Sequence, residues 1–114
     1  MKKFVKVMKA LSDPNRVKII KALQQKSMCV CELQGALNLA QSTVSRHLKI
    51  LEEAGLVDYK KDGLWANYFL ANGKSSPFAA SLLGNLQHWL NEDSEVVELM
   101  KKALFINRED ICGD

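Results

Sequence analysis

The chain has 114 residues, of which 47% are apolar and 25% are charged, as expected for one soluble domain with a single hydrophobic core. Its lysine-rich start contains no uninterrupted apolar block, which excludes a signal peptide and a transmembrane helix and predicts a cytoplasmic protein with reduced thiols. Three cysteines cannot form a disulfide framework, so metal binding or thiol chemistry is the better interpretation of them.

Charge is distributed unevenly along the chain. Residues 1–90 hold 13 Lys and Arg against 6 Asp and Glu, a net +7, whereas residues 91–114 hold 3 against 7, a net −4. A basic body is compatible with a polyanionic partner such as nucleic acid, although an ordinary lysine-rich surface has the same composition. The periodic pattern stops before the end, so we predict one domain, residues 1–106, and an acidic tail, residues 107–114.

The first third of the chain reads as three helices. Apolar residues recur at helical spacing over residues 4–11. The motif "SDP" then ends this helix, and Ser12 or Asp13 can cap a second helix with the proline in its first turn. A short third helix is expected over residues 31–37, and Asn38 can adopt the left-handed conformation that ends it.

A fourth helix, "QSTVSRHLKILEEAG", follows this tight turn, with Gly55 as its natural stop. The spacing of apolar residues then changes from a period of 3.6 to a period of 2. The run "LVDYKKDGLWANYFL" predicts a β-hairpin in which Asp62-Gly63 forms the turn.

Two more helices are expected, over residues 78–90 and 96–104. The first of them has apolar residues on more than one face, so its apolar surface is wider than one small core requires. The resulting order is three helices, a short turn, a fourth helix, a hairpin and two helices. This order predicts a mainly α-helical fold with a β-hairpin wing, a winged helix-turn-helix.

The fourth helix has an outward face suited to DNA. Burial of Val44, Leu48 and Leu51 leaves small, polar and cationic side chains on the other side. Small hydroxyls allow close approach, Gln and Arg can pair with base edges, and Lys neutralises phosphate. An ordinary solvated face is the alternative, and the absence of acidic residues from Gln41 to Leu51 argues against it. The predicted DNA-binding residues are Gln41, Ser42, Thr43, Ser45, Arg46, His47, Lys49, Lys60 and Lys61.

Some of these assignments have a second interpretation. His47 could pack or hydrogen-bond locally as well as contact a phosphate. Lys60 and Lys61 at the wing could equally serve to discourage edge-to-edge aggregation. Ala40 is a poor N-cap for the fourth helix, so either Ser42 caps one residue later or the end stays frayed until a phosphate satisfies it.

Four blocks, "ALSDPNRVKIIKAL", "CVCEL", "STVSRHLKILEEAGLV" and "DGLWANYFL", resemble the ArsR/SmtB family of metal-sensing repressors over roughly residues 4–90. The resemblance implies a homodimer that pairs through its first helix and the helix after the wing. It also implies binding to double-stranded operator DNA at an imperfect inverted repeat, with no cofactor needed, and release when metal binds. Such a repressor is not an enzyme, and its two recognition helices would lie about one DNA turn apart.

Cys29 and Cys31 are placed where extended chain becomes helix. In a regular helix, residues two apart point about 200° apart, so the two sulfurs could not hold one ion. In an extended segment they point the same way. A bound ion would therefore oppose helix formation in the first helix of the DNA-reading pair, which is the bistable element that a switch requires. The positive end of the helix is also expected to lower the thiol pKa values.

Thiolates suit soft, thiophilic ions, and As(III) or Sb(III) needs only two or three sulfurs, whereas zinc prefers four ligands. In the arsenic-responsive branch of the family, the "CVC" pair supplies the arsenic ligands, which the resemblance carries to Cys29 and Cys31. Some members have a third cysteine where this chain has Gln34. The third ligand could come from Cys112, from solvent or glutathione, or be absent, and Cys112 could also be incidental.

Several alternatives stay open at this point. The two cysteines could be small buried hydrophobes, and Met28 is better explained by packing than by ligation. A zinc site like those of related repressors would have only His88, with Glu92 and Asp93, on the helix after the wing. The same thiols could sense cadmium, lead or oxidation. A small thiol enzyme or a protein-interaction module with this fold is the third class. The enzyme is disfavoured, because no base, anion-binding loop or substrate cleft accompanies Cys29.

Overall fold

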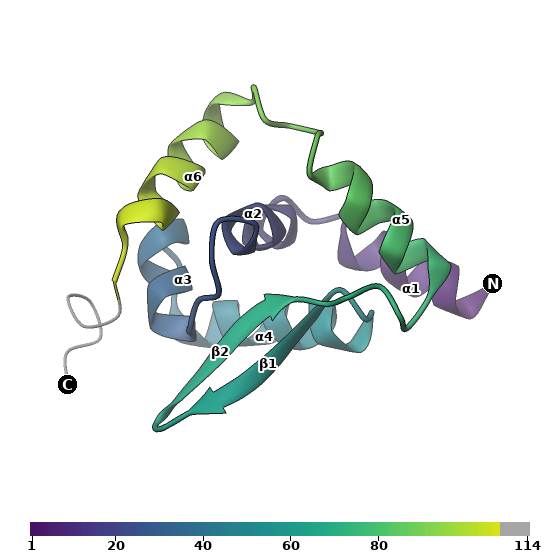
Figure 1. Cartoon of the computed structure of the whole chain (residues 1–114), viewed down its shortest axis with the longest axis horizontal. Helices are drawn as coiled ribbons and strands as arrows, with labels where there is room; N and C mark the ends of the chain where they lie inside the picture. The colour runs from purple at the N-terminus through teal and green to yellow at the C-terminus, as the bar shows by residue number, and fades with distance from the viewer. Residues whose placement is uncertain (108–114) are drawn as a thin grey trace.

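Within the residues that the computed structural model describes, 1–107, six helices and one antiparallel hairpin follow the predicted order (Figure 1). The winged helix-turn-helix architecture is thereby confirmed. The elements are α1 (Lys2–Ala10), α2 (Pro14–Leu23), α3 (Val30–Leu37), α4 (Gln41–Glu53), β1 (Val57–Asp62), β2 (Trp65–Leu70), α5 (Pro77–Leu86) and α6 (Ser94–Phe105).

Local sequence signals explain where these helices begin and end. Of the two candidate caps before α2, Asp13 is used, because its carboxylate accepts hydrogen bonds from the backbone N–H groups of Asn15 (2.8 Å) and Arg16 (3.4 Å). Asn38 has φ 57° and ψ 51° and ends α3 in the left-handed conformation, as predicted. Gly55, with φ 78°, follows the last turn of α4.

The wing is a two-stranded hairpin whose register runs from Val57 opposite Leu70 to Asp62 opposite Trp65. The connecting loop is therefore Gly63-Leu64, one residue later than predicted. Of these two loop residues only Gly63 has a positive φ, 63°, and hairpins that place glycine first in a two-residue loop use this arrangement.

Met28 extends the sheet of the wing by one residue. Its N–H donates to the carbonyl of Tyr68 (3.0 Å) and its carbonyl accepts from the N–H of Tyr68 (2.8 Å). The side chain of Met28 is fully buried, which agrees with the packing role expected for it. The segment before α3 is thus attached to β2.

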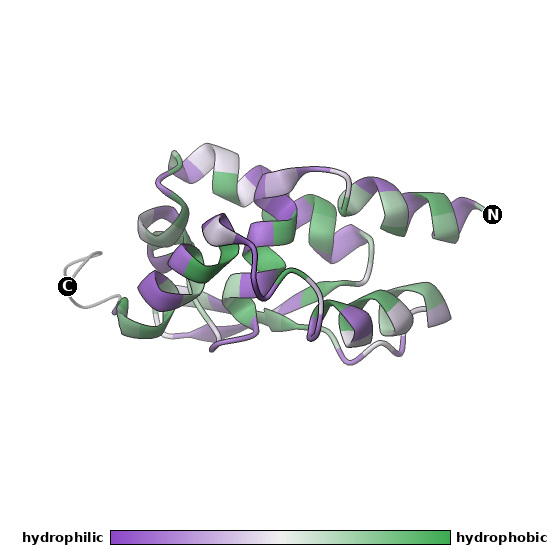
Figure 2. Cartoon of the chain, turned by 90° about the horizontal axis from the view of Figure 1, so that it is seen from above, coloured by the Kyte–Doolittle hydropathy of each residue, from purple (hydrophilic) through white to green (hydrophobic). Residues whose placement is uncertain are grey.

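The core lies between α2, α3, α4 and the wing, with α1 and α5 together at one end and α6 across α2 and α3 at the other (Figure 1). Figure 2 shows that hydrophobic and hydrophilic residues alternate around most helices, as in amphipathic helices that share one core. The fully buried large side chains include Ile19, Ile20, Met28, Leu33, Val44, Leu48, Leu51 and Leu56.

One predicted helix is too long. The pattern predicted a helix over residues 78–90, but α5 ends at Leu86 and the chain turns, with Leu90 at φ 67°. The cause is the buried ammonium of Lys21. Its Nζ donates hydrogen bonds to the carbonyls of Leu86 (2.7 Å) and Trp89 (3.0 Å) and to the side-chain oxygen of Asn91 (2.7 Å), so these carbonyls point inward to the lysine and do not continue a helix.

Among residues 1–107, none of the helices combines the length and the apolar character needed to cross a membrane.

Candidate nucleic-acid interface and thiol site

The outward face of α4 is as predicted. Val44, Leu48 and Leu51 are fully buried, which turns the opposite side of the helix to solvent. Thr43 is half-buried at the edge of this face. The side chains exposed on it are Gln41, Ser42, Ser45, Arg46 and Lys49.

The amino end of α4 is free to receive an anion. Ala40 occupies the N-cap position and no side chain caps the helix there. The first backbone N–H groups of the helix therefore keep their hydrogen-bonding capacity, and the helix dipole adds a partial positive charge. Of the two possibilities considered for this end, capping by Ser42 does not occur, and a phosphate is the natural partner.

His47 does not share this exposed face. Its side chain is only 4% exposed, and its Nδ1 lies 3.2 Å from Nη1 of Arg16. Arg16 also donates from Nε to the carbonyl of Ala10 (2.7 Å), so it connects α4 to the end of α1. Burial lowers the pKa of His47; the Arg16 and Arg46 charges act in the same direction and Asp13 opposes them. The structure thus places this histidine in local packing, the alternative to a phosphate contact.

The two wing lysines are exposed, as a phosphate contact requires. Lys60 lies opposite Asn67 and Lys61 opposite Ala66 in the hairpin. Because neighbouring residues of a strand point to opposite faces, the two ammonium groups occupy different sides of the wing.

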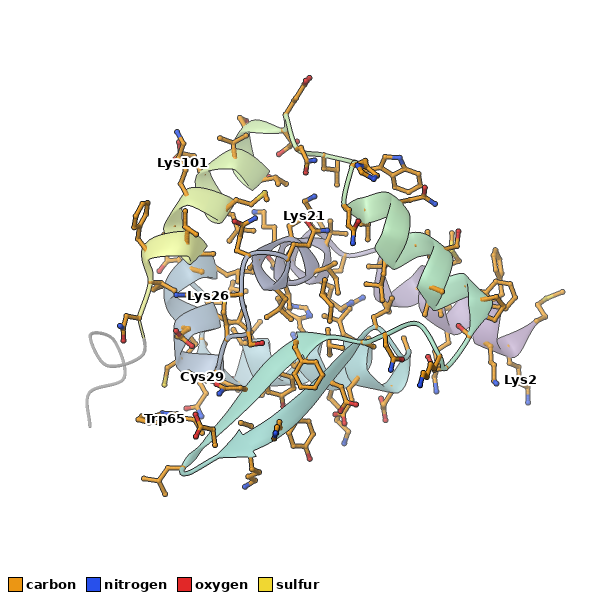
Figure 3. All side chains as sticks on the ribbon, in the orientation of Figure 1. Lys2, Lys21, Lys26, Cys29, Trp65 and Lys101 are labelled. Atoms are coloured by element: carbon orange, nitrogen blue, oxygen red, sulfur yellow. The ribbon has the colours of Figure 1, made fainter. Side chains whose placement is uncertain are left out.

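The cysteine pair lies at the predicted junction of extended chain and helix. Cys29 is the N-cap of α3, with φ −86° and ψ 173°, and Cys31 is in the first turn of the helix. Cys29 is 1% exposed and Cys31 is half-buried. In Figure 3, Cys29 lies at the end of α3 that faces the hairpin.

Both backbone groups of Cys29, its N–H and its carbonyl, form hydrogen bonds within α3. Its N–H donates to Oε1 of Glu32 (3.0 Å) in a capping-box arrangement, and its carbonyl accepts the N–H of Leu33 (3.1 Å). Its predecessor Met28 is paired with Tyr68 of the wing. The chain around this thiol cannot move without breaking hydrogen bonds of α3 or of the sheet.

The expected acidity of this thiol is not observed. Burial raises the pKa of Cys29; the N–H of Glu32 favours the thiolate, but the Glu32 carboxylate adds to the rise. The prediction that the helix start lowers the pKa is therefore wrong for Cys29, because removal from water outweighs the helix dipole.

Within residues 1–107, no three Cys, His, Asp or Glu side chains are grouped so that they could hold a metal ion. The residue types of the two thiols, Cys29 and Cys31, fit a thiophilic ion. Cys112, the predicted third ligand, lies outside the described residues. His88 and Glu92 are exposed, and Asp93 caps α6 by accepting the N–H groups of Glu95 and Val96.

Three polar residues near these sites were not identified from the sequence: Arg16, Lys21 and Glu32. Glu32 is 7% exposed although it is a carboxylate, and Lys21 is fully buried. A signal for Glu32 existed, since a Glu three residues after an N-cap is half of a capping box. No local pattern distinguishes Lys21 from the exposed lysines of the same region.

An apolar surface remains at the end formed by α1 and α5. Phe4 and Phe78 are 43% and 38% exposed, and their rings meet edge to face with centroids 5.3 Å apart. Met8, Trp89 and Leu90 are also between 44% and 49% exposed. This is the surface on which pairing was predicted.

The fold, the exposed polar face of α4 and its uncapped amino end define a winged-helix DNA-binding regulator. A family model described as "Bacterial regulatory protein, arsR family" matches residues 13–59. The arsenical resistance operon repressor of Escherichia coli (strain K12) is 31% identical over 111 residues, which are 96% of this chain and 90% of that protein. The chain therefore belongs to the ArsR family of transcriptional regulators, which are not enzymes.

Other relatives agree in fold. A cadmium resistance regulator of Listeria innocua is 42% identical over 67 residues, and the match spans 58% of this chain but only 56% of that protein. HlyU from Vibrio cholerae has a TM-score of 0.63 at 30% identity, covering 75% of this chain and 88% of that one. The cadmium metal-sensor CMTR from Mycobacterium tuberculosis has a TM-score of 0.55 at 31% identity, and the match covers 75% of this chain and 85% of that one.

Proposed function

We propose that the protein is an arsenite- or antimonite-responsive repressor, which binds double-stranded operator DNA as a homodimer and dissociates when the metalloid binds Cys29 and Cys31. The observation that carries the proposal is the position of this pair. One thiol is the N-cap of α3 and the other lies in its first turn, and α3 is the first helix of the DNA-reading motif. The protein would act in the cytoplasm, where thiols stay reduced.

Operator binding is supported by α4 and the wing. The exposed face of α4 can enter the major groove, with Arg46 directed to base edges and the free N–H groups of the helix to a phosphate. Lys60 and Lys61 would reach neighbouring phosphates from the wing. No cofactor is needed for these contacts.

Dimerisation is supported by the apolar end formed by α1 and α5, where Phe4 and Phe78 are exposed together. A two-fold axis at this end would present two copies of α4 to an imperfect inverted repeat, one DNA turn apart. A single small domain gains stability by covering such a surface.

Release follows from the geometry of the thiols. Each Cys S–H that bonds to As(III) gives its proton to a hydroxide of arsenous acid, which leaves as water. Cys29 has extended backbone and Cys31 lies in the helix, and side chains two residues apart in a regular helix would point apart. We therefore expect the first turn of α3 to open when both sulfurs bind one arsenic. Opening breaks the hydrogen bonds of Cys29 to Glu32 and Leu33 and disturbs the packing of α3 against α4.

The names of the relatives favour this effector without deciding it. The arsenical resistance repressor of Escherichia coli matches over almost the whole chain, whereas the cadmium resistance regulator of Listeria innocua matches a shorter segment. Sensing of cadmium, lead or oxidation through the same thiols is therefore the second candidate. Titration of the reduced protein on labelled operator with arsenite, antimonite, cadmium and zinc separates them.

The decisive variants are Cys29→Ser and Cys31→Ser. Each should bind the operator as the unaltered protein does and should no longer be released by arsenite. Cys112→Ser is the matched control for the loss of a thiol elsewhere, and it distinguishes a two-thiol from a three-thiol site. Normal release from both Cys29→Ser and Cys31→Ser would place the sensor elsewhere.

A further inference from the structure

We propose that Glu32 is a positioning residue that sets the metalloid concentration at which the repressor leaves DNA, by latching the first turn of α3 closed around Cys29. The inference rests on the proposed function, because it assigns a threshold to the same thiol site. It concerns a residue that contacts neither DNA nor the metalloid in the proposed mechanism.

The latch is a buried hydrogen bond between the side chain of Glu32 and the backbone of Cys29, the N-cap residue of α3. Oε1 of Glu32 accepts the N–H of Cys29 at 3.0 Å, with Glu32 only 7% and Cys29 only 1% exposed. Cys29 occupies an N-cap position, where Ser, Thr, Asp or Asn is preferred and a thiol is a weak acceptor. Glu32 therefore carries most of the capping that this turn receives.

The length of α3 makes this cap important. The helix has eight residues, and short helices have little stability of their own. An unpaired N–H at Cys29 would also be buried, since its surroundings are closed to water. Removal of the carboxylate should therefore increase the fraction of molecules in which the first turn is open.

Metalloid binding and operator binding depend differently on the fraction of molecules in which the first turn of α3 is open. The metalloid binds the open turn, so its apparent dissociation constant equals the intrinsic constant divided by the open fraction. DNA binds the closed form, which stays dominant as long as the open form is rare. Loss of the latch should consequently tighten metalloid binding while operator affinity hardly changes. A general loss of folding stability would instead weaken operator binding as well.

The test compares Glu32→Ala with Glu32→Gln, because glutamine can still accept the Cys29 N–H in a capping box. Arsenite affinity is measured on reduced, DNA-free protein by the ultraviolet absorption of the arsenic–thiolate bonds, and operator affinity by fluorescence anisotropy. We expect Glu32→Ala to bind arsenite roughly 3- to 30-fold more tightly, the factor that corresponds to one lost helix cap. Glu32→Gln should stay within about twofold of the unaltered protein.

Asp93→Ala is the matched control, because it removes the cap of α6, which accepts the N–H groups of Glu95 and Val96 away from the thiols. It should leave arsenite affinity unchanged. If Glu32→Ala does not fold, Glu32→Asp, whose carboxylate is one carbon shorter, should shift the affinity in the same direction by a smaller factor.

Three results would overturn the latch. The first is arsenite binding by Glu32→Ala that is equal to or weaker than that of the unaltered protein. The second is an increase in arsenite affinity in Asp93→Ala that equals the increase in Glu32→Ala. The third is an equal increase in Glu32→Gln. Absence of arsenite binding by the unaltered protein would overturn the proposed function as well, so the two failures are distinguishable.

Discussion

Met28 and Tyr68 exchange two backbone hydrogen bonds, of 3.0 Å and 2.8 Å, and thereby join the residue before Cys29 to the second strand of the wing. The thiol is thus one residue from α3 on one side and one residue from the sheet on the other. A ligand that pulls on Cys29 therefore acts on both α3 and the wing.

This connection predicts that the wing responds to the metalloid in the absence of DNA. Trp65 begins β2, three residues before Tyr68, and the variant Trp89→Phe leaves it as the single tryptophan. We expect arsenite to change the fluorescence emission of Trp65 in that variant. The same variant carrying Cys29→Ser should give no change, and an unresponsive Trp65 despite bound arsenite would show that the wing is not coupled to the thiols.

Arg46 is predicted to supply sequence specificity. Arg46→Ala should weaken binding to the operator about 10-fold or more, because a bidentate contact to a base contributes about 1–3 kcal/mol. Lys61→Ala should weaken binding to all sequences alike and lower the slope of log affinity against log salt by about one. Anisotropy titrations at several salt concentrations check both, and an unchanged operator affinity in Arg46→Ala would exclude α4 as the reader.

The buried ammonium of Lys21 is predicted to stabilise the fold. Lys21→Met removes the donor to two carbonyls and one amide oxygen, which should lower the free energy of unfolding by about 2 kcal/mol. Lys18→Met on the same helix is the control, since its partner Glu95 lies 3.6 Å away with a 71% exposed side chain and the pair contributes little. Urea unfolding measures the free energy of unfolding of both variants. Equal losses in Lys21→Met and Lys18→Met would contradict the stabilising role of Lys21.

His47 is predicted to make the folded state sensitive to acid. Its pKa is lowered by burial in the folded protein, so the unfolded chain binds the proton more readily and stability falls as pH drops below the ordinary value of 6.5. One such group contributes a slope of at most about 1.4 kcal/mol per pH unit. The urea midpoint should fall between pH 7.5 and 5.5, His47→Gln should flatten this dependence, and the exposed His88→Gln should not.

Pairing through α1 and α5 is predicted to depend on their aromatic contact. Phe78→Asp should place a charge beside Phe4 and convert the dimer to a monomer, as measured by sedimentation velocity. Phe105→Asp is the control, because Phe105 is 82% exposed on α6 at the other end of the molecule. A dimeric Phe78→Asp would place the interface elsewhere.

The sequence predicted what depends on local periodicity and short signals. The stripe of Val44 and Leu48, the left-handed Asn38 and the change of period at the wing each follow from a few neighbouring residues. The order of elements and the outward face of α4 could therefore be predicted. The junction that holds Cys29 could be predicted for the same reason, because it depends on where one helix starts.

What the sequence did not predict depends on contacts between distant residues. The end of α5 depends on Lys21, 65 positions earlier in the chain than Leu86, and the buried His47 contacts Arg16, 31 positions away. The pKa of Cys29 depends on how completely the core excludes water from it. None of these relationships has a signature in a window of neighbouring residues.

The central claim is that metalloid binding opens the first turn of α3, and amide hydrogen exchange followed by NMR tests it most directly. In the free protein the N–H groups of Cys29 and Leu33 are hydrogen-bonded to Glu32 and Cys29 and should exchange slowly. With one equivalent of arsenite bound, both should lose protection while Leu48 in α4 keeps it. Bound arsenite with undiminished protection of Cys29 and Leu33 would contradict the account.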